Sequence, residues 1–164
     1  MQQLRYLISS TLALIAVIAF AHQSRVELPN ATLQIEINQA IIAINELRAE
    51  KGLKPLQPNP SLMAYAQRRA EELSQKFSHT RPNGQKSHLP LKNFTTFAEN
   101  IATGSNTGKE TVLQWKNSKG HYQNMMGNFD SLGLGAIDNP HTPYQYYWAL
   151  ILSDKNATTE YYLE

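Results

Sequence analysis

The run from Tyr144 to Leu152 is apolar on both of the faces that it would show as a strand, and this constrains the fold more than any other feature of the sequence. Alternate residues of a strand point to opposite sides. One face would hold Tyr144, Tyr146, Trp148, Leu150 and Leu152, and the other Tyr147, Ala149 and Ile151. A strand of this kind has to be covered on both sides. We therefore expect it to lie between two layers of helices.

A second strand is expected just before this run. Leu132, Leu134 and Ala136 alternate with two glycines, which gives the two-residue period of a strand. The intervening residues 139–143, Asn-Pro-His-Thr-Pro, are typical of a turn. Two strands joined by such a turn predict an antiparallel hairpin.

Helices are predicted ahead of the hairpin. Apolar residues recur every three or four positions over residues 32–51 and 60–76, which is typical of amphipathic helices. The charged residues of the second helix are expected to face water, namely Arg68, Arg69, Glu71 and Glu72. Shorter helices are expected over residues 109–117 and from His121 to Met126. Helices followed by a hairpin predict the α+β class, as an α-β-α sandwich with a small antiparallel sheet between helices.

The first 21 residues differ in character from the rest of the chain. Arg5 is their one charge, and it precedes the apolar run from Leu7 to Ala21. The run ends in Ala19-Phe20-Ala21, which suits signal peptidase, and it is shorter than the roughly 20 residues that span a bilayer. An uncleaved membrane anchor is the alternative. We expect a signal peptide over residues 1–21 and a mature protein without a membrane span, secreted or periplasmic.

After the signal peptide we expect a short linker over residues 22–31, one domain over residues 32–153 and a C-terminal tail over residues 154–164. The chain has 164 residues and no cysteine, so an exported domain of this size must be held together by its apolar core. Its net charge is +2, and no basic stripe concentrates that charge. This argues against a nucleic-acid partner.

The side chains that could carry chemistry lie in and after the stretch 77–108, which has no sustained period. His79 and Glu99 lie in this stretch, and His121 follows it. Their separations of 20 and 22 residues match no local metal-binding signature. Taken singly, each histidine is more typical of a surface or core residue than of a functional one. Glu99 lies between apolar neighbours, so it needs a partner if it is buried.

Several segments, taken in order, resemble one family. They are residues 44–53, residues 56–62, Ala66-Gln67, Phe77-Ser78-His79, Ala98-Glu99-Asn100-Ile101-Ala102, Trp115-Lys116-Asn117-Ser118, Gly120-His121 and the strand with Gly133 and Gly135. This order resembles the CAP superfamily, also called SCP-like, of cysteine-rich secretory, antigen 5 and pathogenesis-related 1 proteins. The resemblance covers roughly Leu33 to Leu152. The missing cysteines and the compact connection from Ser118 to His121 look like its bacterial branch.

The resemblance implies a central cleft. In this family two histidines and two glutamates line the cleft and can hold a divalent metal. By position, His79 matches the first histidine, Glu99 the first glutamate and His121 the second histidine. Ser118 stands where the second glutamate would be, and its hydroxyl could equally cap a helix. Two imidazoles and one carboxylate can still bind zinc with an open position, although the loss of one negative charge weakens affinity.

Two function classes follow from this cleft. In the first, an exported module binds a divalent metal such as zinc, a small ligand, a lipid or a cell-envelope component without chemistry. In the second, a metal-dependent hydrolase acts on peptides or glycans outside the cytoplasm. The missing second acid removes a candidate general base, so we favour the binding module over the enzyme.

Overall fold

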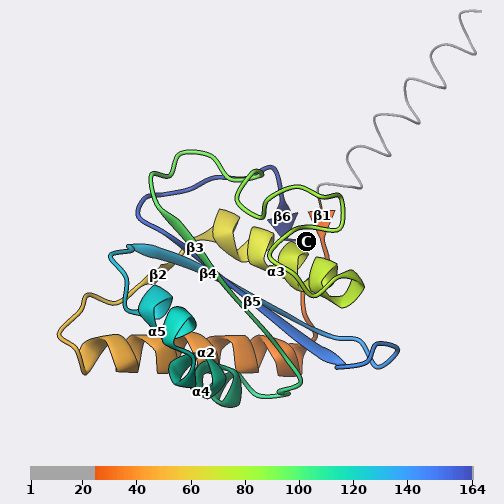
Figure 1. Ribbon diagram of the computed structural model, residues 1–164, viewed down its shortest axis with the longest axis horizontal. Coiled ribbons are helices and arrows are strands. Elements are labelled where there is room, and N and C mark those ends of the chain that lie inside the picture. The colour runs from red at the N-terminus through yellow and green to blue at the C-terminus, as the bar shows by residue number, and fades with distance from the viewer. Residues whose placement is uncertain (1–24, 164) are drawn as a thin grey trace, which may run out of the picture.

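The structure of the protein is a computed structural model that describes residues 25–163 (Figure 1). Its helices are α2 (Ala31–Ala49), α3 (Pro60–Gln75), α4 (Gly108–Asn117) and α5 (Lys119–Met125). Its strands are β1 (Arg25–Val26), β2 (Gln57–Pro58), β3 (Phe97–Thr103), β4 (Ser131–Asp138), β5 (Tyr146–Ser153) and β6 (Tyr162–Leu163). The signal peptide expected over residues 1–21 lies outside the described residues. Among the described residues, no helix is both long and apolar enough to cross a bilayer.

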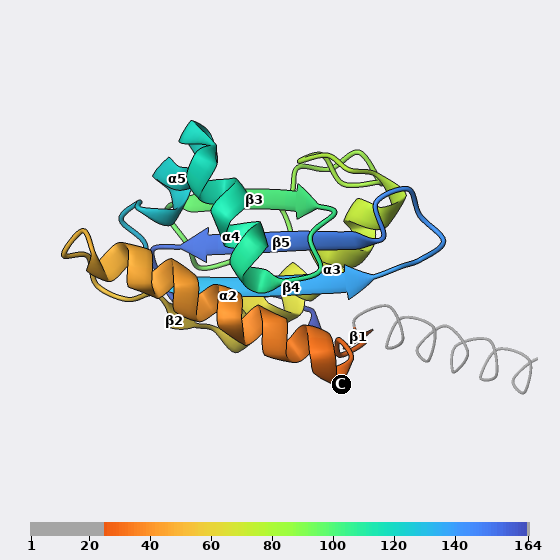
Figure 2. The ribbon, with the colours of Figure 1, turned by 90° about the horizontal axis from the view of Figure 1, so that it is seen from below.

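The helices cover both faces of one sheet, whose strands lie in the order β2-β4-β5-β3. Figure 2 shows α2, α4 and α5 together on one face, while α3 packs against the other. This confirms the α+β class and the α-β-α arrangement expected from the sequence. β5, the strand that is apolar on both faces, pairs with β4 along one edge and with β3 along the other. Helices cover its two faces.

The sheet is mixed, which differs from the antiparallel sheet expected. β2 is two residues long and runs parallel to β4, with Gln57 opposite Ser131. The backbone N–H of Gln57 donates to the backbone oxygen of Asp130. The N–H of Asn59, just after β2, donates to the backbone oxygen of Leu132, and both distances are 2.9 Å. A pairing this short carries no period of its own, so the sequence pattern gives no sign of it.

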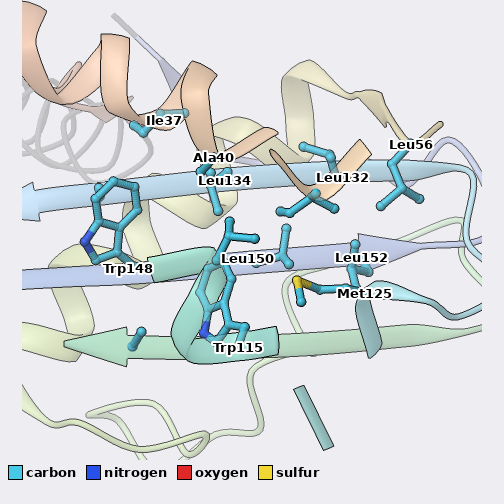
Figure 3. Close-up of a cluster of buried hydrophobic side chains, with 14 of the residues drawn as sticks. Ile37, Ala40, Leu56, Trp115, Met125, Leu132, Leu134, Trp148, Leu150 and Leu152 are labelled. Atoms are coloured by element: carbon cyan, nitrogen blue, oxygen red, sulfur yellow. The ribbon is translucent and has the colours of Figure 1, made fainter. Parts of the chain in front are cut away.

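The two faces of β5 contribute to separate cores, as the alternation predicted. Trp148 and Leu150 belong to the larger core beneath α2, α4 and α5, in which Trp115 of α4 is also buried (Figure 3). Ala149 and Ile151 lie on the other face, in two smaller clusters that include residues of α3. β3, which the sequence pattern did not predict, pairs with β5 and forms one edge of the sheet.

Glycines allow α3 to lie directly on β4. A Cβ atom on Gly133 would fall 2.0 Å from the backbone oxygen of Leu62, and one on Gly135 would fall 2.3 Å from the backbone carbon of Ala66. Both contacts are with helix backbone, which cannot move aside as a flexible side chain would. The two glycines are therefore required by the close approach of helix and strand, and they fix the position of α3.

The two ends of the described chain lie side by side. β1 and β6 form a parallel pair in which Arg25 lies opposite Tyr162, so the segments expected as linker and tail contact each other. Ala157 and Tyr161 are buried. The ring of Tyr161 stacks on that of Tyr65 in α3, with 5.8 Å between the centroids. The C-terminal segment is thus packed onto the body of the domain.

Candidate functional site

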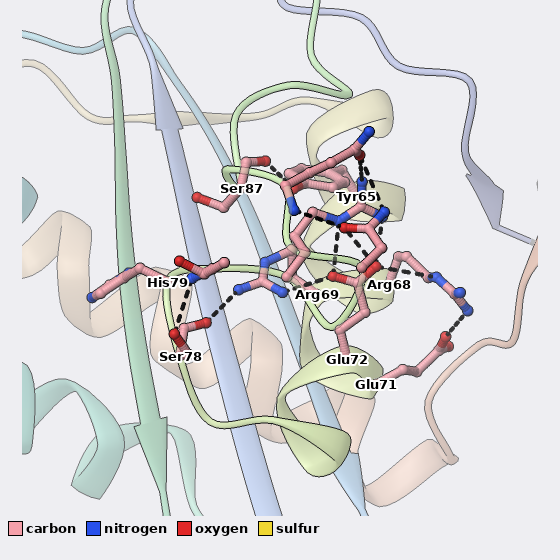
Figure 4. Close-up of polar contacts among 12 residues, drawn as sticks. Tyr65, Arg68, Arg69, Glu71, Glu72, Ser78, His79 and Ser87 are labelled. Carbon is pink, nitrogen blue, oxygen red and sulfur yellow. Dashed lines mark hydrogen bonds and ion pairs between the residues drawn. The ribbon is translucent and has the colours of Figure 1, made fainter.

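A buried network of charges begins at Arg69 on α3 (Figure 4). The Arg69 side chain is 0% exposed, so the expectation that it faces water is wrong. Its Nε donates to Oε1 of Glu99 at 3.0 Å, and its Nη1 donates to Oε2 of Glu72 at 2.7 Å. Its Nη2 donates to the backbone oxygen of Ser78 at 2.9 Å. Arg69 therefore joins α3 to β3 and to the loop that follows α3.

Glu72, also expected to face water, is the second centre of this network. It accepts from Nη2 of Arg81 at 2.6 Å as well as from Arg69. Nη2 of Arg81 also donates to the hydroxyl of Tyr161 at 2.9 Å, which ties in the C-terminal segment. With Glu99, the network holds two guanidinium groups and two carboxylates, all buried, so their formal charges balance.

His79 is the exposed end of the network. Its Nδ1 lies 3.3 Å from Oε2 of Glu99, while 59% of its side chain is exposed. The hydrogen bond with Glu99 raises the pKa of His79 despite partial burial. Burial alone would raise the pKa of Glu99, but the hydrogen bond with His79 and the charge of Arg69 outweigh it and lower this pKa. Glu99 is therefore a carboxylate that orients the His79 ring and leaves Nε2 for another partner.

Glu99→Gln is expected to lower the pKa of His79, because it removes the carboxylate that holds this pKa above its ordinary value of 6.5. Because the pKa of His79 is higher in the folded than in the unfolded state, its contact with Glu99 stabilises the fold at pH values below the unfolded-state pKa. This stabilisation is lost as the pH rises through the folded-state pKa. An NMR titration of the His79 ring measures the shift. Glu46→Gln, on an exposed position of α2, is the control. A pKa of His79 that is the same in both variants would contradict the contact.

His121 lies on α5, at a cleft of about 330 Å³ beside the edge strand β3. The residues that line it include Phe77, Ile101, Gln114, Trp115, Ser118 and His121. Burial and the charge of His79 lower the pKa of His121, which favours its neutral imidazole. The two histidines thus influence each other, although they come from different elements.

Asn100 fixes the backbone that carries His121. It is fully buried on β3, and its Nδ2 donates to the backbone oxygen of His121 at 2.9 Å. Its Oδ1 accepts from Nδ2 of Asn124 at 2.8 Å, so both ends of the amide are held. Sequence reasoning did not select Asn100 or Arg69. For Arg69 a signal exists, since it lies three residues after Ala66 and four before Leu73, beside the apolar stripe of α3.

Ser118 lies where α4 ends and α5 begins, and it also lines the cleft. Its side chain makes no capping hydrogen bond to α5. Its backbone nitrogen instead donates to the oxygen of Trp115 at 3.2 Å. The interpretation as a capping hydroxyl thus finds no support in this geometry, and Ser118 lines the same cleft as His121.

The structure brings His79 and Glu99 into contact, and it places His121 on a cleft whose lining includes neither of these two residues. Within residues 25–163, no three side chains of His, Asp or Glu lie close enough together to hold a metal ion. Both oxygens of Glu99 are already engaged, Oε1 by Arg69 and Oε2 by His79. The contact with Glu99 can orient the ring of His79, as carboxylates do for histidines that bind metals.

Comparison with known proteins places this chain in one family. Residues 41–152 match the profile of the CAP family, described as the cysteine-rich secretory protein family. The chain belongs to this family. It is 34% identical to the uncharacterized protein YkwD of Bacillus subtilis (strain 168) over 102 residues, which is 58% of this chain and 40% of YkwD. The chain therefore spans less than half of the curated relative that it matches.

Two solved structures share the fold. One is an extracellular protein containing a SCP domain from Bacillus anthracis, with a TM-score of 0.63 and 21% identity over 74% of this chain and 41% of that chain. The other is an outer surface protein of Borrelia burgdorferi, with a TM-score of 0.65 and 20% identity over 73% of this chain and 92% of that chain. The match of residues 41–152 to the family profile confirms the expected CAP membership, and these two structures confirm the fold.

Proposed function

We propose that this protein is an extracytoplasmic CAP domain that binds a small ligand in its cleft without chemistry, with a divalent metal such as zinc held by His79 and His121 as the best candidate. The apolar N-terminal segment with its Ala19-Phe20-Ala21 end supports export. The similar folds of a protein described as extracellular and of one described as an outer surface protein support the same location.

The observation that carries the proposal is the contact between His79 and Glu99. A histidine that binds a metal through one ring nitrogen commonly donates from the other to a carboxylate, which fixes its tautomer. The Nδ1 of His79 lies 3.3 Å from Oε2 of Glu99, and Arg69 holds that carboxylate from the other side. His121 supplies a second imidazole whose pKa is lowered, so it is available as a neutral ligand near neutral pH.

The size of the cleft favours a compact ligand over a lipid. Its volume of about 330 Å³ lies at the lower end of the range of roughly 300–1,000 Å³ for small-molecule sites. A metal ion with its water molecules or a small polar group fits such a space. An acyl chain would need a longer apolar channel.

The hydrolase is the weaker candidate, because Glu99 is a poor general base. A general base is most effective when its pKa is close to the working pH. The pKa of Glu99 is lowered, and Arg69 and His79 contact its oxygens. The fourth family position holds Ser118, whose hydroxyl is not a strong base. The geometry therefore supports binding better than catalysis.

Zinc is expected to raise the melting temperature of the purified protein, because only the folded state brings His79 and His121 together. At a free concentration about 100 times the Kd, mass action stabilises by about 2.7 kcal/mol, or roughly 5–10 °C for a domain of this size. The shift should weaken as the pH falls through the pKa of His79, which is raised above 6.5, because protons compete with zinc for the imidazoles. Thermal unfolding with increasing Zn²⁺ measures it.

Matched variants separate this site from zinc binding elsewhere. His79→Ala and His121→Ala should each remove most of the shift, whereas His141→Ala, at an exposed turn, should leave it unchanged. Ser118→Glu should strengthen binding by adding a carboxylate beside His121. A wild type that does not respond to Zn²⁺, together with additive effects of His79→Ala and His121→Ala on stability, would overturn the proposal.

A further inference from the structure

A second and larger cavity, of about 620 Å³, lies on the side of α3 away from His79. Its walls come from the segment between β1 and α2, from the first turn of α2, from α3 and from the end of β4. In Figure 4, Arg68 and Glu71, which line it, lie across α3 from His79. The cavity is large enough for a small ligand and shares no lining residue with the cleft at His121.

The charges that line this cavity do not balance. Of the lining residues within 25–163, Glu27, Glu71 and Asp138 contribute three carboxylates, and Arg68 is the one basic residue. Nη1 of Arg68 donates to Oε2 of Glu71 at 3.1 Å, which accounts for one carboxylate. Among the described residues, neither Glu27 nor Asp138 forms an ion pair, and Asp138 accepts from the neutral amide of Gln145 at 2.9 Å. These four charged side chains together carry a net formal charge of −2.

The pKa of Glu71 reflects this excess of negative charge. Burial raises its pKa, and the carboxylates of Glu27 and Glu72 add to the rise, so that the pKa stays above its ordinary value although Arg68 contacts it. Glu27 and Glu71 line the same cavity, so their like charges repel each other. A cation bound between them would relieve this repulsion.

Part of the remaining wall is apolar and suits an aliphatic stem, while Asn30 and Gln67 also line the cavity. Leu28, Pro29, Leu33 and Ile137 line it, and Leu28 is 53% exposed. An alkyl chain that ends in an ammonium group can lie along such a surface while its charge meets the carboxylates. The cavity is also larger than a single such chain requires, which leaves room for neighbouring peptide groups.

We propose that this cavity binds a lysine side chain of a peptide, with the ammonium group between Glu27, Glu71 and Asp138 and the stem against Leu28 and Ile137. This site is separate from the proposed metal or ligand site and does not depend on it. Charge complementarity and the apolar wall together select a primary amine on a carbon chain.

Calorimetric titration at low ionic strength and pH 7.5 tests the proposal with acetyl-Ala-Lys-Ala-amide as the probe. Saturable binding is expected, and the same peptide with norleucine in place of lysine should bind at least about fivefold more weakly, because it keeps the stem and loses the charge. Equal binding of the two peptides, or no binding of either, would overturn the proposal. So would butylamine that binds as tightly as the peptide, since a free amine would then suffice.

Variants give effects of opposite sign, which a general loss of structure cannot produce. Glu27→Gln and Asp138→Asn should each weaken binding of the lysine peptide about fivefold, because each removes one negative charge from the wall. Arg68→Gln should strengthen it, because it removes the one positive charge of the wall. His121→Ala should have no effect on this titration, so a failure of the metal proposal leaves the result interpretable. Weaker binding by Arg68→Gln would contradict the assignment.

Discussion

Arg69→Met is expected to destabilise the protein by about 3–5 kcal/mol, because it leaves buried carboxylates without their partner. Glu72 and Glu99 are 4% and 6% exposed, so solvent cannot replace the lost guanidinium. Methionine keeps much of the side-chain volume, so the loss reports the charge more than a cavity. Urea unfolding followed by circular dichroism measures the free energy of unfolding.

The neighbouring arginine provides the control. Arg68→Met changes the same residue type one position along α3, but the side chain of Arg68 is 35% exposed, and the loss should stay below about 1 kcal/mol. Adding Glu99→Gln to Arg69→Met should recover part of the stability, because one uncompensated charge is removed as well. Equal losses in the two arginine variants would show that Arg69 is not the buried centre of the network.

Trp115→Ala is expected to destabilise the protein by about 3–5 kcal/mol, because it opens a cavity beneath α4. The side chain is 1% exposed, and its Nε1 donates to the backbone oxygen of Ile101 at 3.3 Å. The substitution removes both this packing and this bond. It also removes a wall of the cleft at His121, so ligand binding should weaken at temperatures where the variant is still folded.

Leu113 tests whether the loss depends on burial. It lies on the same helix but is 54% exposed, so Leu113→Ala should change the free energy of unfolding by about 0.5 kcal/mol or less. Thermal and urea unfolding of both variants compare the two positions directly. A loss below about 1 kcal/mol for Trp115→Ala would place this tryptophan outside the core.

Local patterns were sufficient to predict most helices and the hairpin. The spacing of apolar residues predicted α2 and α3 to within two residues at each end, because a helix face that packs must repeat every three to four positions. The alternation in β5 predicted a covered strand, since both of its faces are buried by residues distant in sequence. Family resemblance then selected His79, Glu99 and His121.

The tertiary structure alone decided what surrounds these residues. β3 is one of the two edge strands, and its mixed polar and apolar residues have no period strong enough to reveal it. Arg69 is buried because β3 brings Glu99 against it from 30 positions away, a contact that helix periodicity cannot express. Whether Glu99 binds a metal or orients His79 therefore depends on an arginine that the sequence pattern had assigned to water. Local sequence sets which residues share a face, whereas the partners of a buried charge are set by how the faces meet.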